Sequence, residues 1–281
     1  SGTKVTKEVI EAGKKLKIIG RAGAGLDNVD LEAASKKGII VMNTPGGNTI
    51  STAEHALSLI MSLVRNIPQA NASMKKGEWD RKKFMGIELY GKTLGIIGLG
   101  RIGTEVATRA ISFKMKVLAY DPFLSIEKAK ELGVEVVDFE ELLKNSDIIT
   151  LHTPLTDQTK HLIGEDEFKI MKYGVRIVNC ARGGIVDEAA LNKFIESGKV
   201  AGAALDVYEN EPPKGSPLLA KENVTMTPHL GASTEEAQVN VAIDIAESVR
   251  DALLNKGIRN AVNMPSVEPE VLKYMEPYLN L

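Results

Sequence analysis

The sequence predicts an α/β protein with a parallel sheet covered by helices on both faces. From about Leu94 onward, short apolar runs rich in β-branched residues alternate with segments of helical period, a pattern typical of successive βα units. The runs are apolar on both faces, as expected for strands of a parallel sheet buried between helices. The 281 residues are 43% hydrophobic and 26% charged, the balance of a globular protein. These observations predict the doubly wound α/β class.

The first part of the chain predicts a smaller domain. Strands are expected at Leu16–Gly20 and Ile39–Met42, with a helix at Leu31–Lys37 between them. A βαβ pattern of this size cannot bury its apolar face alone. We expect it to pack against the long amphipathic helix Thr234–Leu254 near the other end of the chain. The smaller domain therefore combines residues 1–45 and 234–281.

The remaining residues, 46–233, predict one continuous larger domain. It opens with a long amphipathic helix, Thr49–Arg65, and continues into the alternating block. The strands expected there are Leu94–Gly98, Lys116–Tyr120, Val134–Val137, Ile148–Leu151, Arg176–Asn179, Ala201–Leu205 and Val224–Met226. The helices expected between them are Ile102–Ser112, Ile126–Leu132, Phe139–Lys144 and Glu188–Ser197.

A glycine-rich turn follows the first strand of this block. The run T-L-G-I-I-G-L-G-R-I-G contains the pattern G-x-G-x-x-G at Gly98, Gly100 and Gly103. Gly98 allows the tight turn, Gly100 lets the backbone approach a pyrophosphate, and Gly103 lets the helix pack close to the strand. The helix N-terminus then offers unpaired N–H groups to an anion. The turn lies between a strand and a helix, the context that the motif requires, so it predicts a dinucleotide-binding Rossmann domain.

The next predicted strand ends in a carboxylate, at the position that distinguishes NAD from NADP in such domains. Asp121 lies 18 residues after Gly103, at the end of K-V-L-A-Y-D. A carboxylate there hydrogen-bonds the adenine ribose of NAD and repels the 2′-phosphate of NADP. Pro122 and Phe123 follow, with no adjacent arginine to neutralise such a phosphate. The sequence therefore predicts NAD; the alternative is a purely structural glycine turn beside a strand-end aspartate.

Three polar residues follow the ends of later strands. Arg182 lies in N-C-A-R-G-G, Glu211 in D-V-Y-E-N-E-P-P and His229 in T-P-H-L-G-A-S. Each has a structural alternative: a loop brace, a solvated carboxylate and a structural imidazole. Ligands of such sheets bind beyond the carboxyl ends of the strands, so their joint occurrence favours one site. A cation, a carboxylate and an imidazole there can bind an anionic substrate and move a proton.

The other histidines and the cysteine rank lower as catalytic candidates. His55 lies in the amphipathic helix and is expected to be structural, His152 follows a strand and is expected near the cofactor cleft, and His161 is expected at the surface. Their spacing to one another and to Cys180 is not that of zinc ligands, so we expect no metal.

Composition and charge exclude several classes of protein. The net charge is −2 and the basic residues are dispersed, so no nucleic-acid partner is expected. The longest apolar stretch, Ala56–Val64, is shorter than a membrane span. The N-terminus lacks both a signal-peptide core and an initiator Met, which indicates a processed chain or a fragment. The single cysteine suits a reducing compartment, so a cytoplasmic location is expected, with a removed transit peptide as the alternative.

Taken together, these motifs resemble the D-isomer-specific 2-hydroxyacid dehydrogenases. The resemblance runs from R-A-G-A-G-L-D-N-V-D (Arg21–Asp30) to V-N-M-P (Val262–Pro265). Its landmarks are M-N-T-P-G-G-N-T-I-S-T-A-E-H, G-L-G-R-I-G, L-H-T-P-L-T, N-C-A-R-G-G-I-V-D-E and P-H-L-G-A-S-T. Within the family, D-R-K-K-F-M-G (Asp80–Gly86) and A-G-A-A-L-D-V are most similar to the branch that oxidises 3-phosphoglycerate.

The resemblance implies hydride transfer from a D-2-hydroxy acid to NAD, with roles for the three polar residues. Arg182 would hold the substrate carboxylate and carbinol oxygen. His229 would take the hydroxyl proton, and Glu211 would orient His229 and stabilise its protonated form. The further cofactor contacts implied are Arg101, Ile102, Thr153, Cys180, Ala181, Asp206, Gly231 and Ala232.

The resemblance also implies a substrate domain and an assembly. The smaller domain would be a flavodoxin-like α/β unit that presents Ala24 and Gly25 to a phosphorylated 2-hydroxy acid; some relatives carry a hydroxyl residue at the position of Ala24. The helix Thr49–Arg65 and the arm Lys75–Gly86 would form the interface of a homodimer or higher homo-oligomer. Arg81 on that arm is expected to reach the partner's site.

Departures from the family pattern leave alternatives open. Family members begin with about two further βα units, so this chain is expected to be truncated at its N-terminus and its substrate domain incomplete. An inactive NAD-binding core is therefore one alternative. A glyoxylate or hydroxypyruvate reductase is another, although such enzymes often prefer NADP, which Asp121 disfavours. A third is an NAD-sensing co-regulator that keeps the same three polar residues and binds partner proteins.

Overall fold

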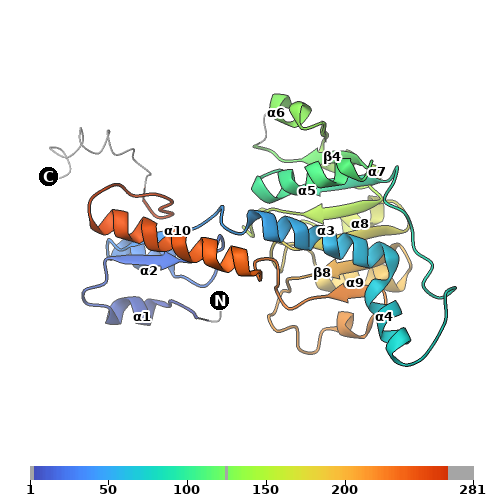
Figure 1. Ribbon diagram of the computed structural model, residues 1–281, viewed down its shortest axis with the longest axis horizontal. Helices are drawn as coiled ribbons and strands as arrows, with labels where there is room; N and C mark the ends of the chain where they lie inside the picture. Colours follow the sequence, from blue (N-terminus) through green and yellow to red (C-terminus); the bar gives the residue numbers. More distant parts are fainter. Residues whose placement is uncertain (1–2, 124–125, 265–281) are drawn as a thin grey trace. The chain divides into compact units, whose positions relative to one another are not determined.

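The computed structural model describes residues 3–123 and 126–264, which fall into two compact units. Unit 1 contains Ser1–Thr49 and Ala232–Leu281, and unit 2 contains Ile50–Gly231. Each unit is built around its own sheet (Figure 1). Within the described ranges, no helix is long and apolar enough to cross a membrane.

Unit 2 contains a seven-stranded sheet in which every pair of neighbouring strands is parallel. Its strand order is β5-β4-β3-β6-β7-β8-β9, so the chain winds outward from β3 in one direction and then from β6 in the other. This order confirms the doubly wound prediction and puts the topological switch point between β3 and β6. The strands are β3 (Thr93–Ile97), β4 (Lys116–Tyr120), β5 (Glu135–Val136), β6 (Ile148–Leu151), β7 (Val175–Asn179), β8 (Val200–Leu205) and β9 (Val224–Met226).

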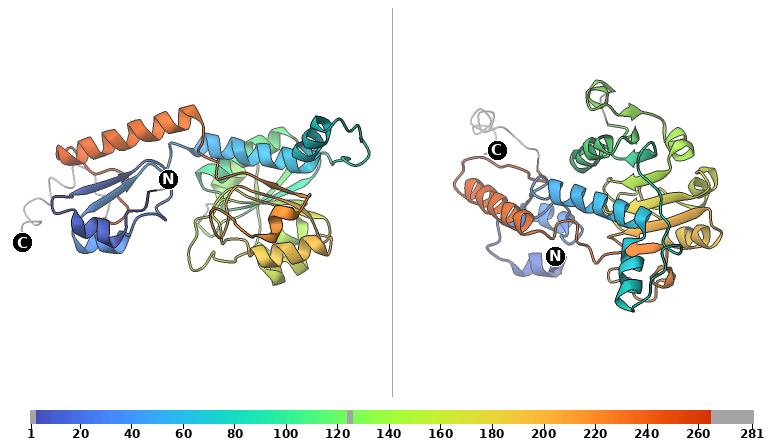
Figure 2. Two further views of the ribbon diagram at one scale, coloured as in Figure 1. Left: turned by 90° about the horizontal axis from the view of Figure 1, so that it is seen from below. Right: turned by 45° about the vertical axis from the view of Figure 1, so that its right-hand side comes forward.

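Helices cover both faces of this sheet, and Figure 2 shows α3 on one side and α9 on the other. One buried cluster joins the sheet to α3 (Thr49–Arg65) and α5 (Arg101–Ser112). The opposite cluster joins it to α7 (Phe139–Asn145), α8 (Glu165–Ile170) and α9 (Glu188–Glu196). The remaining helices of unit 2 are α4 (Ile67–Lys75), α6 (Ile126–Glu131) and the short 3₁₀ helix η1 (Pro217–Ala220).

Strand β3 illustrates why the strands had to be apolar throughout. Leu94 and Ile96 are buried in the cluster of α3 and α5, whereas Ile97 belongs to the opposite cluster. A Cβ on Gly95 would lie 2.2 Å from Ser146 Oγ and 2.7 Å from Leu142 Cδ2 of α7, so any larger residue would force these side chains to shift. Alternate residues of a strand point to opposite faces, and both faces here are covered.

Several short elements differ from the sequence-based expectations. Helices α1 (Lys7–Ala12), α4 and α8 were not predicted. Each buries a single residue, Ile10, Ser73 and Phe168 respectively, so its sequence carries no clear apolar stripe. The strand expected at Val134–Val137 shortens to the two residues of β5, which pairs only with β4 at the sheet edge. Element ends elsewhere shift by one or two residues, the usual uncertainty at fraying ends.

Unit 1 contains a parallel pair of strands, β1 (Ile18–Arg21) and β2 (Ile40–Asn43), with α1 and α2 (Leu31–Lys36). The long helix α10 (Glu235–Leu253) packs on this pair. A Cβ on Gly20 of β1 would lie 2.8 Å from Ile245 and 2.9 Å from Val249 of α10, so the helix and the strand are in close contact. This confirms that the early βαβ pattern is completed by the helix near the far end of the chain.

Candidate active site

The three glycines of the turn differ in what surrounds them. Gly98 has φ +91°, and a Cβ there would lie 2.8 Å from His152 O. A Cβ on Gly103 would lie 2.1 Å from Gly98 O, which explains the close packing of α5 against β3. A Cβ on Gly100 would meet nothing within 4 Å among the described residues. Gly98 and Gly103 are therefore required by the fold. Gly100, the N-cap of α5, instead leaves open space in which an anion fits.

Asp121 lies against the same turn. Its Oδ2 accepts a hydrogen bond from Leu99 N at 2.8 Å, and its Oδ1 accepts one from Phe123 N at 2.9 Å. The carboxylate thus links the end of β4 to the glycine turn, which follows the neighbouring strand β3. Arg101 and Ile102 begin α5 directly after Gly100, and Ile102 packs partly into the core.

The loops after β6 and β7 supply neutral groups beside this turn. Thr153 Oγ1 and His152 Nδ1 are buried and have no hydrogen-bond partner within residues 3–123 and 126–264. Burial lowers the pKa of His152 to about 4, so its ring is neutral at physiological pH, and Nε2 lies 3.0 Å from Thr150 Oγ1. Burial, reinforced by Asp206, raises the pKa of the Cys180 thiol. Cys180 is consequently an uncharged group, and a hydroxyl such as that of Thr153 is free to bond a ligand.

The structure brings Glu211 and His229 together. His229 Nδ1 lies 2.9 Å from Glu211 Oε2, and the two side chains are 51% and 40% exposed. They belong to the loops after β8 and β9, and Arg182 lies in the loop after β7. Since β7, β8 and β9 are adjacent parallel strands, their three loops emerge at the same edge of the sheet. Arg182 donates through Nη1 to Ala181 O at 2.6 Å.

Buried contacts hold these three loops in place. Asn179, at the end of β7, donates through Nδ2 to Arg182 O at 2.9 Å, and its Oδ1 accepts from Ala181 N at 3.0 Å. Tyr208 OH donates to Thr227 O at 2.8 Å, and Tyr208 N donates to Glu211 Oε1 at 3.3 Å. Both carboxylate oxygens of Glu211 are therefore engaged.

Three residues of this support were missed by the sequence analysis: Asn179, Tyr208 and Thr227. Asn179 is the one that carried a usable signal, because a polar residue at the end of an apolar strand is expected to be buried and hydrogen-bonded. Its 2% exposure agrees with that rule. The other two act through partners about 20 positions away, which no local pattern encodes.

Asp206, expected among the cofactor contacts, is buried and accepts several hydrogen bonds. Its Oδ1 accepts from Leu230 N at 2.7 Å and its Oδ2 from Gly231 N at 2.8 Å. His55 Nε2 lies 3.1 Å from Oδ1. Ala232 O, in unit 1, accepts from Gln238 Nε2 at 2.9 Å.

The expected substrate contacts lie in separate parts of the chain. Ala24 and Gly25 follow β1 in unit 1, where Ala24 O accepts from Asn43 Nδ2 at 2.7 Å. Arg81 lies on the exposed segment after α4 in unit 2. Their roles remain predictions.

The last histidine, His161, lies at the surface, and the possible metal ligands can be examined in the same way. His161 is 42% exposed, with Nε2 3.2 Å from Glu209 Oε1 and Nδ1 3.9 Å from Asp187 Oδ2. In the part of the chain that the structure describes, no group of three or more His, Cys, Asp or Glu side chains is placed to hold a metal ion.

Curated proteins match this chain over nearly its whole length. The family model described as D-isomer specific 2-hydroxyacid dehydrogenase, NAD binding domain, matches residues 57–231. The D-3-phosphoglycerate dehydrogenase of Archaeoglobus fulgidus is 59% identical over 282 residues, covering 100% of this chain and 54% of that protein. The enzyme of the same name from Bacillus subtilis is 53% identical, covering 99% of this chain and 53% of that protein. The chain thus spans about half the length of these curated relatives.

Solved structures agree in fold. A glyoxylate reductase from Paecilomyes thermophila superposes with a TM-score of 0.86 at 38% identity, covering 93% of this chain and 80% of that one. A D-lactate dehydrogenase from Aquifex aeolicus, complexed with NAD and lactic acid, gives 0.84 at 35% identity, covering 94% of this chain and 85% of that one. With its glycine turn, its strand-end Asp121 and these matches, the chain belongs to the D-isomer-specific 2-hydroxyacid dehydrogenase family and carries that family's NAD-binding domain in residues 57–231.

Proposed function

We propose that the chain oxidises D-3-phosphoglycerate to 3-phosphooxypyruvate with NAD, the first step of L-serine biosynthesis. The observation that carries this proposal is the 2.9 Å contact between His229 Nδ1 and Glu211 Oε2, one strand away from the loop of Arg182. The choice of substrate is supported by relatives named D-3-phosphoglycerate dehydrogenase at 53–59% identity.

His229 acts as the general base. Because Glu211 accepts from Nδ1, that nitrogen carries the ring proton and Nε2 keeps its lone pair. Nε2 then takes the proton of the substrate hydroxyl as the C2–H bond breaks. Glu211 stabilises the resulting positive charge, and its second oxygen is held by Tyr208 N.

Arg182 binds the substrate carboxylate. A guanidinium remains charged at any physiological pH and matches a carboxylate with two parallel N–H donors. This places C2 of the substrate beside the imidazole. When bound, NAD supplies the hydride acceptor, and the residues that would hold it are those of the glycine turn, Asp121 and Thr153, together with Cys180, Ala181, Asp206, Gly231 and Ala232.

The smaller unit binds the rest of the substrate. We assign Ala24 and Gly25, in the loop after β1, to contacts with the acid, and Arg81 to its phosphate or carboxylate from a neighbouring subunit. The loop of Ala24 is tied to the end of β2 by Gly23 N, which donates to Thr44 Oγ1 at 2.7 Å. Residues 1–45 and 234–281 accordingly form the substrate domain, and residues 46–233 the cofactor domain.

The test is NADH formation by the purified chain with D-3-phosphoglycerate, D-lactate, D-glycerate and D-2-hydroxyglutarate. We expect preferential turnover of D-3-phosphoglycerate. Preferential turnover of another acid would replace the proposed substrate. NAD binding with no turnover of any acid would contradict the proposal and favour a core that needs further segments, or an NAD-sensing regulator.

Reduction of glyoxylate or hydroxypyruvate is the second candidate, favoured by the glyoxylate reductase that superposes with a TM-score of 0.86. It predicts consumption of NADPH or NADH with glyoxylate. Asp121 opposes this candidate as far as NADPH is concerned, because a carboxylate repels the 2′-phosphate. Faster glyoxylate reduction than 3-phosphoglycerate oxidation would favour the reductase.

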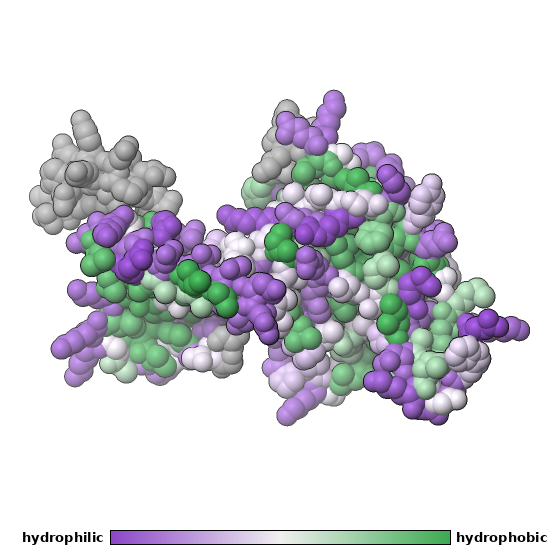
Figure 3. Space-filling view, in the orientation of Figure 1, coloured by the Kyte–Doolittle hydropathy of each residue, from purple (hydrophilic) through white to green (hydrophobic). Residues whose placement is uncertain are grey.

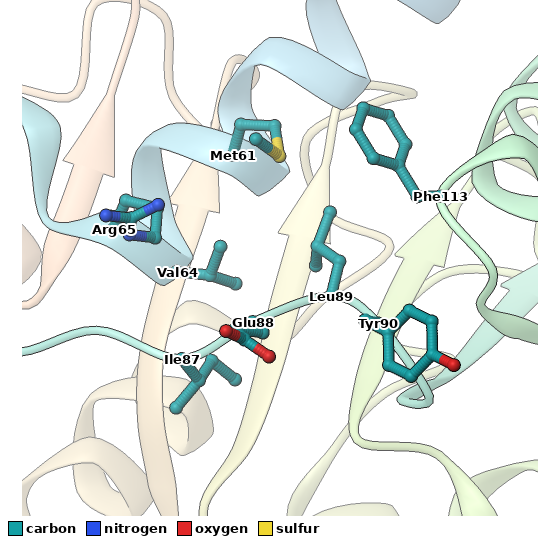
Figure 4. Close-up of a pocket in the computed structure, with 8 residues that line it drawn as sticks. All are labelled: Met61, Val64, Arg65, Ile87, Glu88, Leu89, Tyr90 and Phe113. Carbon is teal, nitrogen blue, oxygen red and sulfur yellow. The ribbon is translucent and has the colours of Figure 1, made fainter.

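We further propose a homodimer formed through α3 and the segment after α4. A groove of about 400 Å³ is lined by Met61, Val64 and Arg65 of α3, by residues 87–90 and by Phe113, and Figure 4 shows these side chains around it. Apolar surface is exposed on the face of unit 2 that α3 and α5 cross (Figure 3). Trp79 and Met85 on the neighbouring segment are 76% and 80% exposed. An apolar patch of this kind, next to a groove, fits a second copy of the chain.

A cytoplasmic location completes the proposal. The sequence contains one cysteine, and Cys180 is a buried free thiol, which suits a reducing compartment. Fractionation of cells that make the protein, followed by immunoblotting, tests this location.

A further inference from the structure

Helix α3 presents a histidine to the buried carboxylate of Asp206. His55 Nε2 lies 3.1 Å from Asp206 Oδ1 and 3.2 Å from Thr227 Oγ1. Asp206 is 1% exposed, and the His55 side chain is 18% exposed. Thr227 itself donates to Asp206 Oδ1 at 2.6 Å. Since both oxygens near the ring accept hydrogen bonds, Nε2 carries a proton and donates to them.

Asp206 in turn collects the residues on both sides of His229. Thr227 lies two positions before it, and Leu230 and Gly231, which follow it, donate their backbone N–H groups to the same carboxylate. The backbone of Asp206 takes part too, because its carbonyl accepts from His229 N at 2.9 Å. One aspartate therefore holds the whole loop 227–231.

The loop needs such an anchor because His229 has an unusual backbone. Its φ is +56°, in the left-handed region that residues with a Cβ rarely adopt. A residue persists there only when its surroundings impose the conformation. The direction of the His229 ring toward Glu211 consequently depends on the contacts that flank it.

The N-terminal turns of α3 supply a second set of contacts to this loop. Ser51 Oγ donates to Gly231 O at 3.0 Å, and Thr52 Oγ1 donates to the same carbonyl at 3.2 Å. Together with His55, they form a polar patch near the start of this amphipathic helix. An apolar residue at position 55 would leave a buried carboxylate with one donor fewer, which is unfavourable.

We propose that His55 is a positioning residue of the dehydrogenation site: by donating to Asp206 and Thr227 it fixes the loop 227–231 and thereby the orientation of His229. This inference rests on the proposed role of His229 as the base. Helix α3 would then support the loop of the base through hydrogen bonds, in addition to packing against the sheet.

Burial alone would disfavour the ionised form of Asp206, but the hydrogen bonds from His55, Thr227 and Leu230 outweigh it, so the pKa of this carboxyl lies below its ordinary value. The carboxylate therefore stays charged at neutral pH, and a charged acceptor makes the stronger hydrogen bonds.

The test compares His55→Gln, which keeps an N–H near the position of Nε2, with His55→Leu, which removes it, in the full-length protein. We expect His55→Leu to lower kcat about tenfold, the effect of losing one hydrogen bond to a charged group. His55→Gln should restore most of that loss. Because Asp206 and Gly231 are also assigned to the cofactor, NAD affinity is measured in both variants, and we expect it to fall by less than kcat does. Leu63→Val, on the same helix but outside the network, is the control for lost packing.

A second measurement reports on the loop without turnover. Hydrogen exchange of the Leu230 and Gly231 amides should accelerate in His55→Leu but not in His55→Gln or Leu63→Val. This readout stands even if the wild-type protein oxidises none of the acids, in which case the proposed function fails and the positioning role is judged on exchange alone. Equal defects in the Gln and Leu variants would overturn the proposal, as would a Leu variant that loses only thermal stability.

Discussion

At the scale of single residues, two pairs of side chains differ in their exposure to solvent. Glu211 and His229 are about half exposed and in contact with each other. His152 and Cys180 are buried beside the cofactor turn, where burial lowers the pKa of the imidazole to about 4 and raises that of the thiol. The first pair is thus open to solvent, whereas the second consists of groups that are uncharged at neutral pH.

Replacing His229 by Ala should abolish turnover and leave NAD binding intact. The imidazole acts on the substrate proton, and general-base catalysis contributes about 10²- to 10⁴-fold. Steady-state rates measure turnover. Titration of the protein with NADH, followed by the change in NADH fluorescence, measures cofactor affinity. A large loss of NAD affinity would show that the ring serves the cofactor rather than the substrate.

Asp121 is expected to set the preference for NAD over NADP. Asp121→Ala should lower that preference by at least about tenfold, because a carboxylate beside a 2′-phosphate is repelled by several kcal/mol. Asp121→Asn is the informative control, since it removes the charge but keeps an acceptor for Leu99 N. The ratio of kcat/KM for the two cofactors measures the effect, and an unchanged ratio in both variants would exclude this role.

The neutral His152 predicts a pH dependence of stability. The unfolded chain protonates this ring below about pH 6.5, whereas the folded protein does so only near pH 4. The free energy of unfolding should therefore fall as the pH drops through this window, by about 1.4 kcal/mol per unit at most. Between pH 7.5 and 5, urea unfolding should show wild type losing about 2 kcal/mol more than His152→Gln. Parallel curves would mean that the ring titrates normally.

At the scale of elements, glycines mark where one segment of backbone touches another. Gly103 brings α5 against the turn at Gly98, and Gly183 brings the loop after β7 against the loop after β8. A Cβ on Gly183 would lie 1.8 Å from Tyr208 O. These contacts determine how close the Arg182 and Glu211 loops can approach.

Gly183→Ala should therefore separate those two loops. We expect a loss of kcat/KM of about 100-fold, because misplacing catalytic groups by about 1 Å has an effect of this size. Gly46→Ala, whose Cβ would meet nothing within 4 Å in the described ranges, should be neutral. Full activity of Gly183→Ala would show that the loops can shift without consequence.

At the scale of the whole molecule, the chain forms two units with separate cores. Its larger unit leaves an apolar groove and several large apolar side chains exposed. This arrangement is what a subunit of a larger assembly would show in isolation.

The proposed dimer predicts that an added charge in the groove produces monomers. Phe113→Glu and Tyr90→Glu should each halve the mass measured by sedimentation, because a carboxylate in an apolar interface loses its hydration. Tyr173→Glu, at a residue that is 77% exposed elsewhere on the same unit, should leave the mass unchanged. A wild-type protein that sediments as a monomer would contradict the dimer.

The local patterns of the sequence were sufficient for the doubly wound class, the glycine turn and the strand-end positions of Arg182, Glu211 and His229. The strands and turns that carry them are encoded by neighbouring residues: apolar runs buried on both faces, and glycines where a Cβ cannot fit. Helices α4 and α8 were not predicted because each buries only one residue, so neither sequence carries a clear apolar stripe.

Only the tertiary structure decided which side chains meet. The bond between His229 and Glu211 joins residues 18 positions apart, and that between His55 and Asp206 joins residues 151 positions apart. The sequence analysis classed His55 as structural, because the apolar periodicity of α3 does not reveal that Asp206, at the end of β8, lies beside it. By itself the sequence determined most of the elements and the glycine turn, since these depend on local backbone preferences and burial. The hydrogen-bond network around His229 arises only when distant strand ends are packed side by side.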